Sequence, residues 1–503
     1  MTDDLAQRFR RLSRTIHDLQ QAQGVLDWDQ QTMMPRRGMT QRSRQLAALA
    51  TVIHDKLTAP ELGEVIAGLE GQGDGLDPLL AADLRELRRE RDRAVRIPEE
   101  LVAERARVCA EAQAAWEEAY ERNSYPLFKP HLERVLDIVR RVTAALSASR
   151  EGVGAYDLML EEYEPGATEA QLRELFDGLG PTLSALLGRI LDAPREGRPD
   201  RELLRGSFPI AAQERFLRQV IERMGFDFAA GRVDRSVHPF TAGTMHDVRI
   251  TNRYREDYLA PAVFGMIHEA GHALYEQGLD PERYRDPAGG YCSLGIHESQ
   301  SRLWENLVGR SRPFWSFHLP LLKQVFPALA PIDLDAFVGA INEVRPSLVR
   351  VDADEVTYNL HIVLRFRLES ALLSGDLDVA DLPGAWRDQT QELFGLQPAT
   401  DREGALQDVH WSAGLFGYFP TYALGNLYGA QFLEAMRRDV TDLDERIAAG
   451  DLSPIKGWLN EKIHSQGRRY LAPELCERVT GAPLSPEPAI GHLERKYIAL
   501  YKL

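Results

Sequence analysis

The chain has 503 residues, of which 44% are hydrophobic and 27% charged, so it can bury a large core and is neither disordered nor fibrous. Its formal net charge of −16 excludes a generally basic surface, and with it general binding to nucleic acid or anionic membranes. Three cysteines without a C-x-x-C pair exclude a disulfide scaffold and a cysteine-built zinc finger. They fit a reducing compartment. With no export signal after Met1 and no apolar run long enough for a membrane helix, we expect a cytoplasmic protein.

Helical periodicity dominates the chain. Apolar residues recur at spacings typical of one buried helix face in segments 4–23, 80–87, 99–122, 130–150, 169–192, 319–345, 355–374 and 427–449. One segment, residues 246–254, differs because Val248 and Ile250 alternate with Arg249 and Thr251, which predicts a short strand. The breaks between helices are short, and none resembles an interdomain linker. The pattern predicts a mostly α fold with a small β element.

Residues 268–272 read H-E-A-G-H and match the motif H-E-x-x-H. Residues four apart share one face of a helix, so His268 and His272 can converge on one cation while Glu269 points beside them. The alternative is a pair of helix histidines that only form hydrogen bonds within a core.

A catalytic zinc site needs a third protein ligand and an open position for water. No metzincin-type extension follows His272, so the third ligand must come from elsewhere. Glu298, on a second expected helix 26 residues later, is the best candidate, and an ion pair with Arg302 is its alternative role. His297 is a rival ligand, but adjacent helix positions point about 100° apart, so both are not expected to bind the same ion.

Such a site predicts metal-assisted hydrolysis of an amide bond. The cation lowers the pKa of its bound water and polarises the scissile carbonyl. Glu269 takes the proton of the water and passes it to the leaving amine. The sequence contains neither a G-x-S-x-G nucleophile motif nor a phosphate-binding P-loop motif, which would indicate other chemistry.

Further polar residues are candidates for the rest of an active site. An extended edge near His238 could hold a peptide backbone by strand addition. Arg249 or Arg350 could bind a terminal carboxylate through paired hydrogen bonds. The candidate donors to the developing oxyanion are His410, Tyr418 and Tyr422. Each has a structural alternative: an ion pair of Arg350 with Asp352 or Asp354, aromatic packing at the edge of a core, or a histidine in a turn.

Six ordered motifs carry a resemblance to a known family. They are H-P-F (238–240), D-x-R-x-T (247–251), H-E-x-x-H (268–272), H-E-S-Q (297–300), [IV]-R-x-x-A-D (349–354) and G-x-x-Q-D-x-H-W (404–411). Together they resemble the thermostable-type, Taq carboxypeptidase-like metallocarboxypeptidases. Similar stretches at 24–30, 34–35 and 417–420 extend the resemblance to nearly the whole chain. One segment departs from the family pattern, since residues 241–246 contain fewer glycines than the usual loop of the family.

The resemblance implies an almost all-helical single domain over residues 1–503 with a small β-sheet beside a deep groove. This is the zincin fold of the neurolysin and angiotensin-converting-enzyme type. The resemblance also implies zinc, with cobalt able to substitute, and carboxypeptidase action of broad specificity on peptides, with poor cleavage at proline. A homodimer is implied as well.

Carried over motif by motif, the resemblance assigns roles to named residues. The expected metal ligands are His268, His272 and Glu298, and the general base and acid is Glu269. The expected residues of the groove are His238, Arg249, Arg350, Gln407, His410, Tyr418 and Tyr422. Which arginine and which tyrosine act stays open.

Two other functions are open. An oligoendopeptidase or dipeptidyl-carboxypeptidase with the same zinc site would also cleave peptides with a blocked C-terminus. A catalytically silent helical scaffold is less favoured because Glu269, which a silent site would not require, is intact beside the paired histidines.

Overall fold

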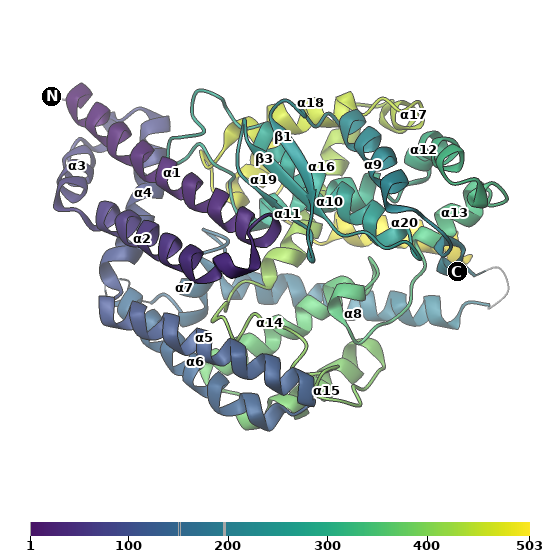
Figure 1. Cartoon of the computed structure of the whole chain (residues 1–503), viewed down its shortest axis with the longest axis horizontal. Helices are drawn as coiled ribbons and strands as arrows, with labels where there is room; N and C mark the ends of the chain where they lie inside the picture. The colour runs from purple at the N-terminus through teal and green to yellow at the C-terminus, as the bar shows by residue number, and fades with distance from the viewer. Residues whose placement is uncertain (1, 149, 151, 195–197) are drawn as a thin grey trace. The chain divides into compact units, whose positions relative to one another are not determined.

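The computed structural model describes residues 2–148, 150, 152–194 and 198–503 and is mostly helical with one small sheet (Figure 1). It divides into two compact units, each assembled from three separate segments of the chain. The first unit consists of Met1–Val95, Asp200–Ile341 and Phe432–Pro483, and the second of Arg96–Pro199, Asn342–Gln431 and Leu484–Leu503. The predicted mostly α fold with a small β element is confirmed, whereas the single domain over residues 1–503 stays a prediction.

The first unit contains the N-terminal helices and those around the H-E-x-x-H motif. Its helices are α1 (Thr2–Thr32), α2 (Met39–Thr58), α3 (Pro60–Glu70), α4 (Pro78–Arg96), α9 (Ile210–Met224), α10 (Ala260–Gln277), α11 (Leu294–Arg302), α12 (Arg312–Val325), α13 (Leu334–Ile341), α17 (Leu443–Ala448), α18 (Ser453–Lys462) and α19 (Ala472–Thr480). Helix α1 lies beside α2 (Figure 1), and α1, α3 and α4 share a core that includes Phe9 and Ile66. The stripe Leu80, Leu84 and Leu87 is buried in α4, as its spacing predicts.

The sheet of the first unit has three strands, β1 (Gly231–Arg235), β2 (Phe240–Ala242) and β3 (Val248–Asn252), in the order β1-β3-β2. The central strand β3 is parallel to β1 and antiparallel to β2. The side chains of Val248 and Ile250 are fully buried, and the Asn252 side-chain amide donates a hydrogen bond to the Ala262 carbonyl in α10 at 2.9 Å. The strand predicted within 246–254 is therefore present, and it anchors the sheet to the helix that carries the motif.

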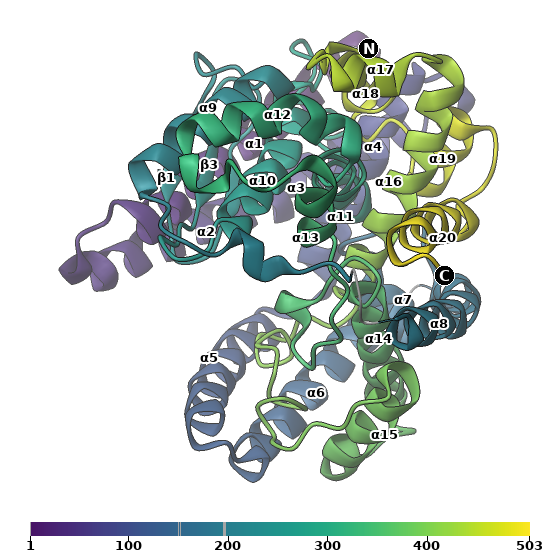
Figure 2. The ribbon, with the colours of Figure 1, turned by 90° about the vertical axis from the view of Figure 1, so that its right-hand side faces the viewer.

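The second unit is formed by α5 (Glu99–Arg122), α6 (Tyr125–Ser147), α7 (Ala155–Leu160), α8 (Glu169–Asp192), α14 (Tyr358–Ser374), α15 (Leu382–Phe394) and α20 (Glu487–Tyr501). Helix α16 (Pro420–Asp439) contributes residues to both units. Helices α5 and α6 run side by side (Figure 2). Asn123 lies between them in the left-handed conformation, with φ 51°, and this residue ends α5 and reverses the chain. The limits of α5 and α8 agree with the predicted segments.

Two helices predicted from periodicity are wrong in their extent. Residues 319–345 form no single helix, because α12 ends before Pro327, which starts a short 3-10 turn, and α13 follows only at Leu334. Proline lacks the backbone N–H that would continue a helix. The segment 427–449 is likewise divided between α16 and α17. Among the described helices, none combines the length and apolar character that a membrane span requires.

Candidate metal centre

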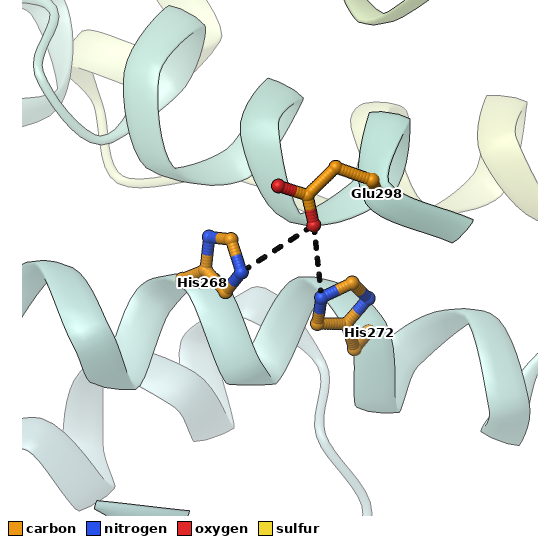
Figure 3. A group of neighbouring side chains, drawn as sticks. All are labelled: His268, His272 and Glu298. Carbon is orange, nitrogen blue, oxygen red and sulfur yellow. Dashed lines mark ion pairs between the residues drawn. The ribbon is translucent and has the colours of Figure 1, made fainter. Parts of the chain in front are cut away.

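Helix α10 presents both histidines of the H-E-x-x-H motif on one face, as their spacing predicts (Figure 3). Pro261 lies in its first turn, where a missing N–H leaves no hydrogen bond unmade, and Gly278 caps its last turn. His268 and His272 both point toward α11 (Figure 3). Glu269, which directly follows His268 on this helix, is only 7% exposed.

Helix α11 brings Glu298 to the two imidazoles. The Ser293 hydroxyl accepts a hydrogen bond from the Ile296 N–H at 3.1 Å and so caps the start of this helix. Glu298 Oε2 then lies 3.6 Å from His268 Nε2 and 3.4 Å from His272 Nε2 (Figure 3). The ligand atoms of these three side chains all lie within 4.8 Å of one another. Among the described residues, no other cluster of three or more histidine, cysteine or acidic side chains converges in this way. The structure thus brings the three predicted ligands together.

A second carboxylate, which sequence reasoning missed, supports His268 from the other side of its ring. Glu305 Oε2 lies 2.9 Å from His268 Nδ1. Glu305 belongs to a π-helical turn, Leu303–Val308, that continues α11, and its other oxygen accepts a hydrogen bond from Arg310 at 3.2 Å. Such wide turns are frequent at functional sites. The signal in the sequence was the spacing, since Glu305 follows Glu298 by seven residues, about two turns of a helix.

The side chain of Glu269 is held by the sheet. The Thr241 hydroxyl, on β2, donates a hydrogen bond to Glu269 Oε2 at 2.8 Å. Burial raises the pKa of Glu269, while the nearby His268 imidazole and the Thr241 hydrogen bond oppose part of this rise. A carboxylate with a raised pKa can take up and release a proton closer to neutral pH. Thr241 was not singled out from the sequence as a partner of Glu269.

The protonation of the three candidate ligands suits a cation. Burial and the adjacent His297 lower the pKa of His272 to about 3, so this imidazole is neutral at pH 7. Burial would raise the pKa of Glu298, but the Arg302 guanidinium and both imidazoles outweigh burial and hold that pKa well below its ordinary value. The pKa of His268 is raised despite burial because two carboxylates flank its ring. A cation that binds here would compete with a proton for His268.

A family model described as carboxypeptidase Taq (M32) metallopeptidase matches residues 8–497. This chain belongs to the M32 family. Thermostable carboxypeptidase 1 of Thermus thermophilus is 45% identical to this M32 chain over 94% of each chain, and carboxypeptidase 1 of Bacillus subtilis is 36% identical over 98% of each.

Solved structures of carboxypeptidases share the fold. The M32 carboxypeptidase from Deinococcus radiodurans R1 has a TM-score of 0.95 at 37% identity, over 99% of this chain and 100% of that one. For metallocarboxypeptidase 1 of Trypanosoma cruzi the TM-score is 0.93 at 34% identity, over 98% of this chain and 99% of that one. The resemblance that the six motifs indicated is confirmed, and the chain is a metallocarboxypeptidase with a mostly helical zincin fold. Its family implies a metal cofactor.

In the second unit of this M32 carboxypeptidase, Arg350 lies in a buried network around Asp408. Arg350 Nη2 is 2.9 Å from Asp408 Oδ1, and Arg365 Nε donates to Asp408 Oδ2 at 2.6 Å. Gln407 Oε1 accepts hydrogen bonds from the Arg350 N–H and from Arg365, both at 2.7 Å. The ion pair of Arg350 is therefore made with Asp408, 58 residues along the chain, and not with an acid of its own motif.

Three more of the predicted residues lie together in the second unit. The rings of His410 and Tyr418 are 5.6 Å apart, and those of Tyr418 and Tyr422 are 5.4 Å apart. The guanidinium carbon of Arg350 lies 5.2 Å from the centroid of the Tyr422 ring. Burial lowers the pKa of His410 to about 4, so its imidazole is neutral and one ring N–H can donate.

The remaining predicted residues, His238 and Arg249, lie in the first unit. His238 is exposed and precedes β2. Arg249 donates two hydrogen bonds to Asp247, both at 2.8 Å, and its guanidinium carbon lies 4.4 Å from the centroid of the Trp28 ring. The edge of the Arg249 guanidinium is therefore occupied by Asp247, and its face by the Trp28 ring. The first unit holds His238, Arg249, His268, Glu269, His272 and Glu298, and the second holds Arg350, Gln407, His410, Tyr418 and Tyr422.

Proposed function

We propose that this metallocarboxypeptidase is a zinc enzyme that removes single residues from the C-terminus of oligopeptides of broad sequence, with Glu269 as general base and acid. The observation that carries the proposal is the convergence of two imidazole Nε2 atoms and one carboxylate oxygen (Figure 3). They lie beside Glu269, which is buried and hydrogen-bonded. Two histidines and one glutamate are a frequent ligand set of catalytic zinc.

The spacing of the donor atoms supports zinc. Two ligands that each lie about 2.1 Å from a tetrahedral zinc ion lie about 3.4 Å from each other. Glu298 Oε2 is 3.4 Å from His272 Nε2 and 3.6 Å from His268 Nε2. His268, His272 and Glu298 would hold the ion, and cobalt would fit the same donors. The ion, when bound, acidifies a water molecule and polarises the scissile carbonyl.

Glu269 carries the proton transfers in this proposal. Its carboxylate lies on the ligand helix, one residue after His268, and Thr241 fixes its Oε2. The pKa raised by burial lets Glu269 accept a proton from water and then release it to the leaving amine. The hydrogen bond from Thr241 at 2.8 Å would hold the Glu269 carboxylate in one orientation through both proton transfers.

Arg350 is the proposed partner of the C-terminal carboxylate of the substrate. Two buried guanidiniums, Arg350 and Arg365, share one carboxylate, Asp408, which leaves one positive charge in excess. Asp408 is the only acid of the described residues within ion-pair distance of either. An uncompensated buried charge is costly, so a bound substrate carboxylate would be stabilised there. Arg249 already has a carboxylate of its own, Asp247.

The other predicted residues receive supporting roles. We propose His410, Tyr418 and Tyr422 as donors to the oxyanion, without choosing between the tyrosines. Gln407 holds the Arg350 backbone and Arg365, so it would place the carboxylate site rather than contact the peptide. His238 precedes the edge strand β2, along which an extended peptide could be bound by its backbone, and Arg249 lies on the neighbouring central strand β3.

One experiment tests the proposed reaction. An N-acetylated oligopeptide and its C-amidated twin are incubated with the zinc-loaded enzyme, with and without a chelator, and the products are followed by mass spectrometry. Stepwise loss of single C-terminal residues from the free acid alone, abolished by the chelator, is expected. Internal or dipeptide cuts in both peptides would favour an oligoendopeptidase. The Glu269→Gln variant should retain zinc and lose activity by about 10²- to 10⁴-fold; unchanged activity would exclude the assigned role.

A paired substitution tests the choice of arginine. Arg350→Lys keeps the positive charge but loses the planar fork, so it should raise KM for the free-acid peptide and reduce the discrimination against the amide. Arg249→Lys is the matched control and should leave that discrimination unchanged. The reverse result would move the carboxylate site to Arg249.

Assembly and location stay proposals that rest on the resemblance. We propose a homodimer whose partners are peptide substrates and not nucleic acid or membranes, acting in the cytoplasm. Sedimentation of the purified chain at several concentrations tests the dimer, because a monomer throughout would contradict it.

A further inference from the structure

A chain of three side chains leads from His272 to a buried carboxylate on the same helix. His297 Nδ1 lies 2.5 Å from His272 Nδ1, and His297 Nε2 lies 3.1 Å from Glu276 Oε1. The rings of His272 and His297 are stacked, with centroids 4.5 Å apart. The Glu276 side chain is 9% exposed and that of His297 is 13% exposed, so both contacts are largely shielded from water.

The local structure explains why these residues meet. Glu276 follows His272 by four residues on α10, so the two share a face of the helix. His297 precedes Glu298 on α11, and adjacent helix positions point about 100° apart. While Glu298 faces the Nε2 side of His272, His297 reaches its Nδ1 side. His297, the rival ligand of the sequence analysis, therefore contacts the Nδ1 side of His272 and does not face the candidate cation position.

Counting protons leaves one arrangement that keeps His272 able to bind a cation. A neutral imidazole whose Nε2 lone pair faces the ligand position carries its proton on Nδ1. His272 Nδ1 therefore donates to His297 Nδ1, which must accept. The proton of a neutral His297 is then on Nε2, where it donates to Glu276. If His297 Nδ1 were the donor instead, the proton of His272 would occupy Nε2 and block the cation.

We propose that Glu276 and His297 form a positioning relay that fixes the tautomer of His272 and strengthens its donation to the metal. The negative charge of Glu276 favours the proton on His297 Nε2, which leaves His297 Nδ1 as an acceptor for His272. His268 receives the same support directly from Glu305, whereas His272 receives it through an intervening imidazole. The relay rests on the proposed metal centre, since it acts only through a ligand of that centre.

The surroundings of the relay keep its hydrogen bonds strong. The ring of Tyr275, which is fully buried, lies 5.3 Å from that of His297, and the ring of Tyr291 lies 4.7 Å from it, edge-on. These two aromatic rings restrict the orientation of the His297 imidazole and shield it from water. In such an environment a hydrogen bond to a carboxylate is worth more than at the surface. A metal-bound histidine is ordinarily oriented by one carboxylate or carbonyl group. His268 has such a partner in Glu305, whereas His272 is supported by two side chains in series, His297 and Glu276.

The test measures zinc affinity, which does not depend on turnover. The full-length chain is prepared as the wild type, Glu276→Gln, His297→Phe, the double variant and the control Tyr291→Phe. The zinc dissociation constant of each is determined by competition with a chelator of known affinity. Glu276→Gln and His297→Phe should each bind zinc about 10- to 100-fold more weakly than the wild type. The double variant should be no weaker than His297→Phe alone, because Glu276 acts only through His297. Tyr291→Phe keeps the ring and should leave the affinity unchanged.

Three outcomes would overturn the relay. These are wild-type affinity in both single variants, losses that multiply in the double variant, or an equal loss in Tyr291→Phe. Glu276→Gln is nearly isosteric, so it tests the relay even if His297→Phe fails to fold. His272→Ala separates the two proposals: if it binds zinc as tightly as the wild type, the metal centre itself is refuted. If His272→Ala loses zinc while the relay variants do not, only the relay is refuted.

Discussion

Gly271 and Ser301 set how closely α10 and α11 approach each other. A Cβ atom added to Gly271 would lie 2.6 Å from the Ser301 Cα and 2.7 Å from the Gln300 carbonyl oxygen, closer than non-bonded atoms tolerate. Gly271 stands directly before His272, and Ser301 stands three residues after Glu298. The glycine of the H-E-A-G-H motif therefore lets the backbone of the third ligand come within reach of the two histidines.

We predict that Gly271→Ala destabilises the protein and weakens metal binding together. Forcing a methyl group against a neighbouring backbone costs about 1–3 kcal/mol, and moving α11 away displaces Glu298. Denaturant unfolding and a zinc-binding titration measure the two effects. Gly178→Ala on α8 is the matched control, since nothing lies within 4 Å of its added Cβ; it should be neutral or stabilising. Equal behaviour of the two variants would contradict the role of Gly271.

Thr241→Val should lower kcat while zinc content stays the same. Valine has the shape of threonine but cannot donate to Glu269 Oε2, which Thr241 contacts at 2.8 Å. Hydrogen bonds to charged groups contribute about 1.5–3 kcal/mol, so a loss of about 10- to 100-fold is expected. Thr241→Ser keeps the hydroxyl and should retain most of the activity. A Thr241→Val enzyme with full kcat would show that Glu269 needs no orienting donor.

Glu305→Gln should weaken zinc binding by about 10- to 100-fold, because it removes the charge that faces His268 Nδ1. The pKa of Glu305 is lowered to about 2 because hydrogen bonding by His268 and the adjacent Arg302 outweigh burial, so the group is ionised at every pH at which the enzyme would be assayed. The ratio of the zinc dissociation constants of the variant and the wild type should therefore stay the same between pH 6 and pH 9. A loss confined to one end of that range would point to another group.

Glu369 gives a prediction about stability and pH. It is fully buried on α14, and its carboxyl group accepts a hydrogen bond from the Gly417 N–H; burial raises its pKa from 4.5 to about 8. Between these values the folded chain keeps a proton that the unfolded chain has lost, so this group makes the free energy of unfolding fall as pH rises through this window. Glu369→Gln keeps an acceptor for Gly417 but cannot ionise.

The Glu369→Gln variant should gain stability over the wild type by a margin that grows from pH 5 to pH 8 and then levels off. The measurement is denaturant unfolding at pH 5, 7 and 9 for both proteins. A difference that stays constant over this range would mean that Glu369 does not titrate there.

Local patterns in the sequence predicted those features that depend on neighbouring residues. The limits of α5, the strand β3 and the shared face of His268 and His272 all follow from periodicity and spacing within one segment. The sequence also predicts Glu298 as the third ligand, because it lies on a second expected helix 26 residues after His272. The wide turn that carries Glu305 was not predicted, since a π-helical turn leaves no periodic signal over six residues.

Features that depend on long-range packing could not be predicted in the same way. The carboxylate partner of Arg350 is 58 residues away, and an acid nearby in the sequence was the natural expectation. In sequence, Glu276 is an ordinary polar residue near the end of a helix, and no local pattern marks it. Only the approach of α11 to α10 makes it part of a buried contact with His297.

The interleaved chain path of the two units has a consequence for biosynthesis. The polypeptide passes from one unit to the other five times, and neither unit is complete before residues 483 and 503, respectively, have been made. A growing chain therefore cannot complete the first unit before most of the second has been translated, in contrast to proteins whose domains fold in order of synthesis. Because each unit is assembled from three separate segments, no continuous piece of the gene encodes one unit alone.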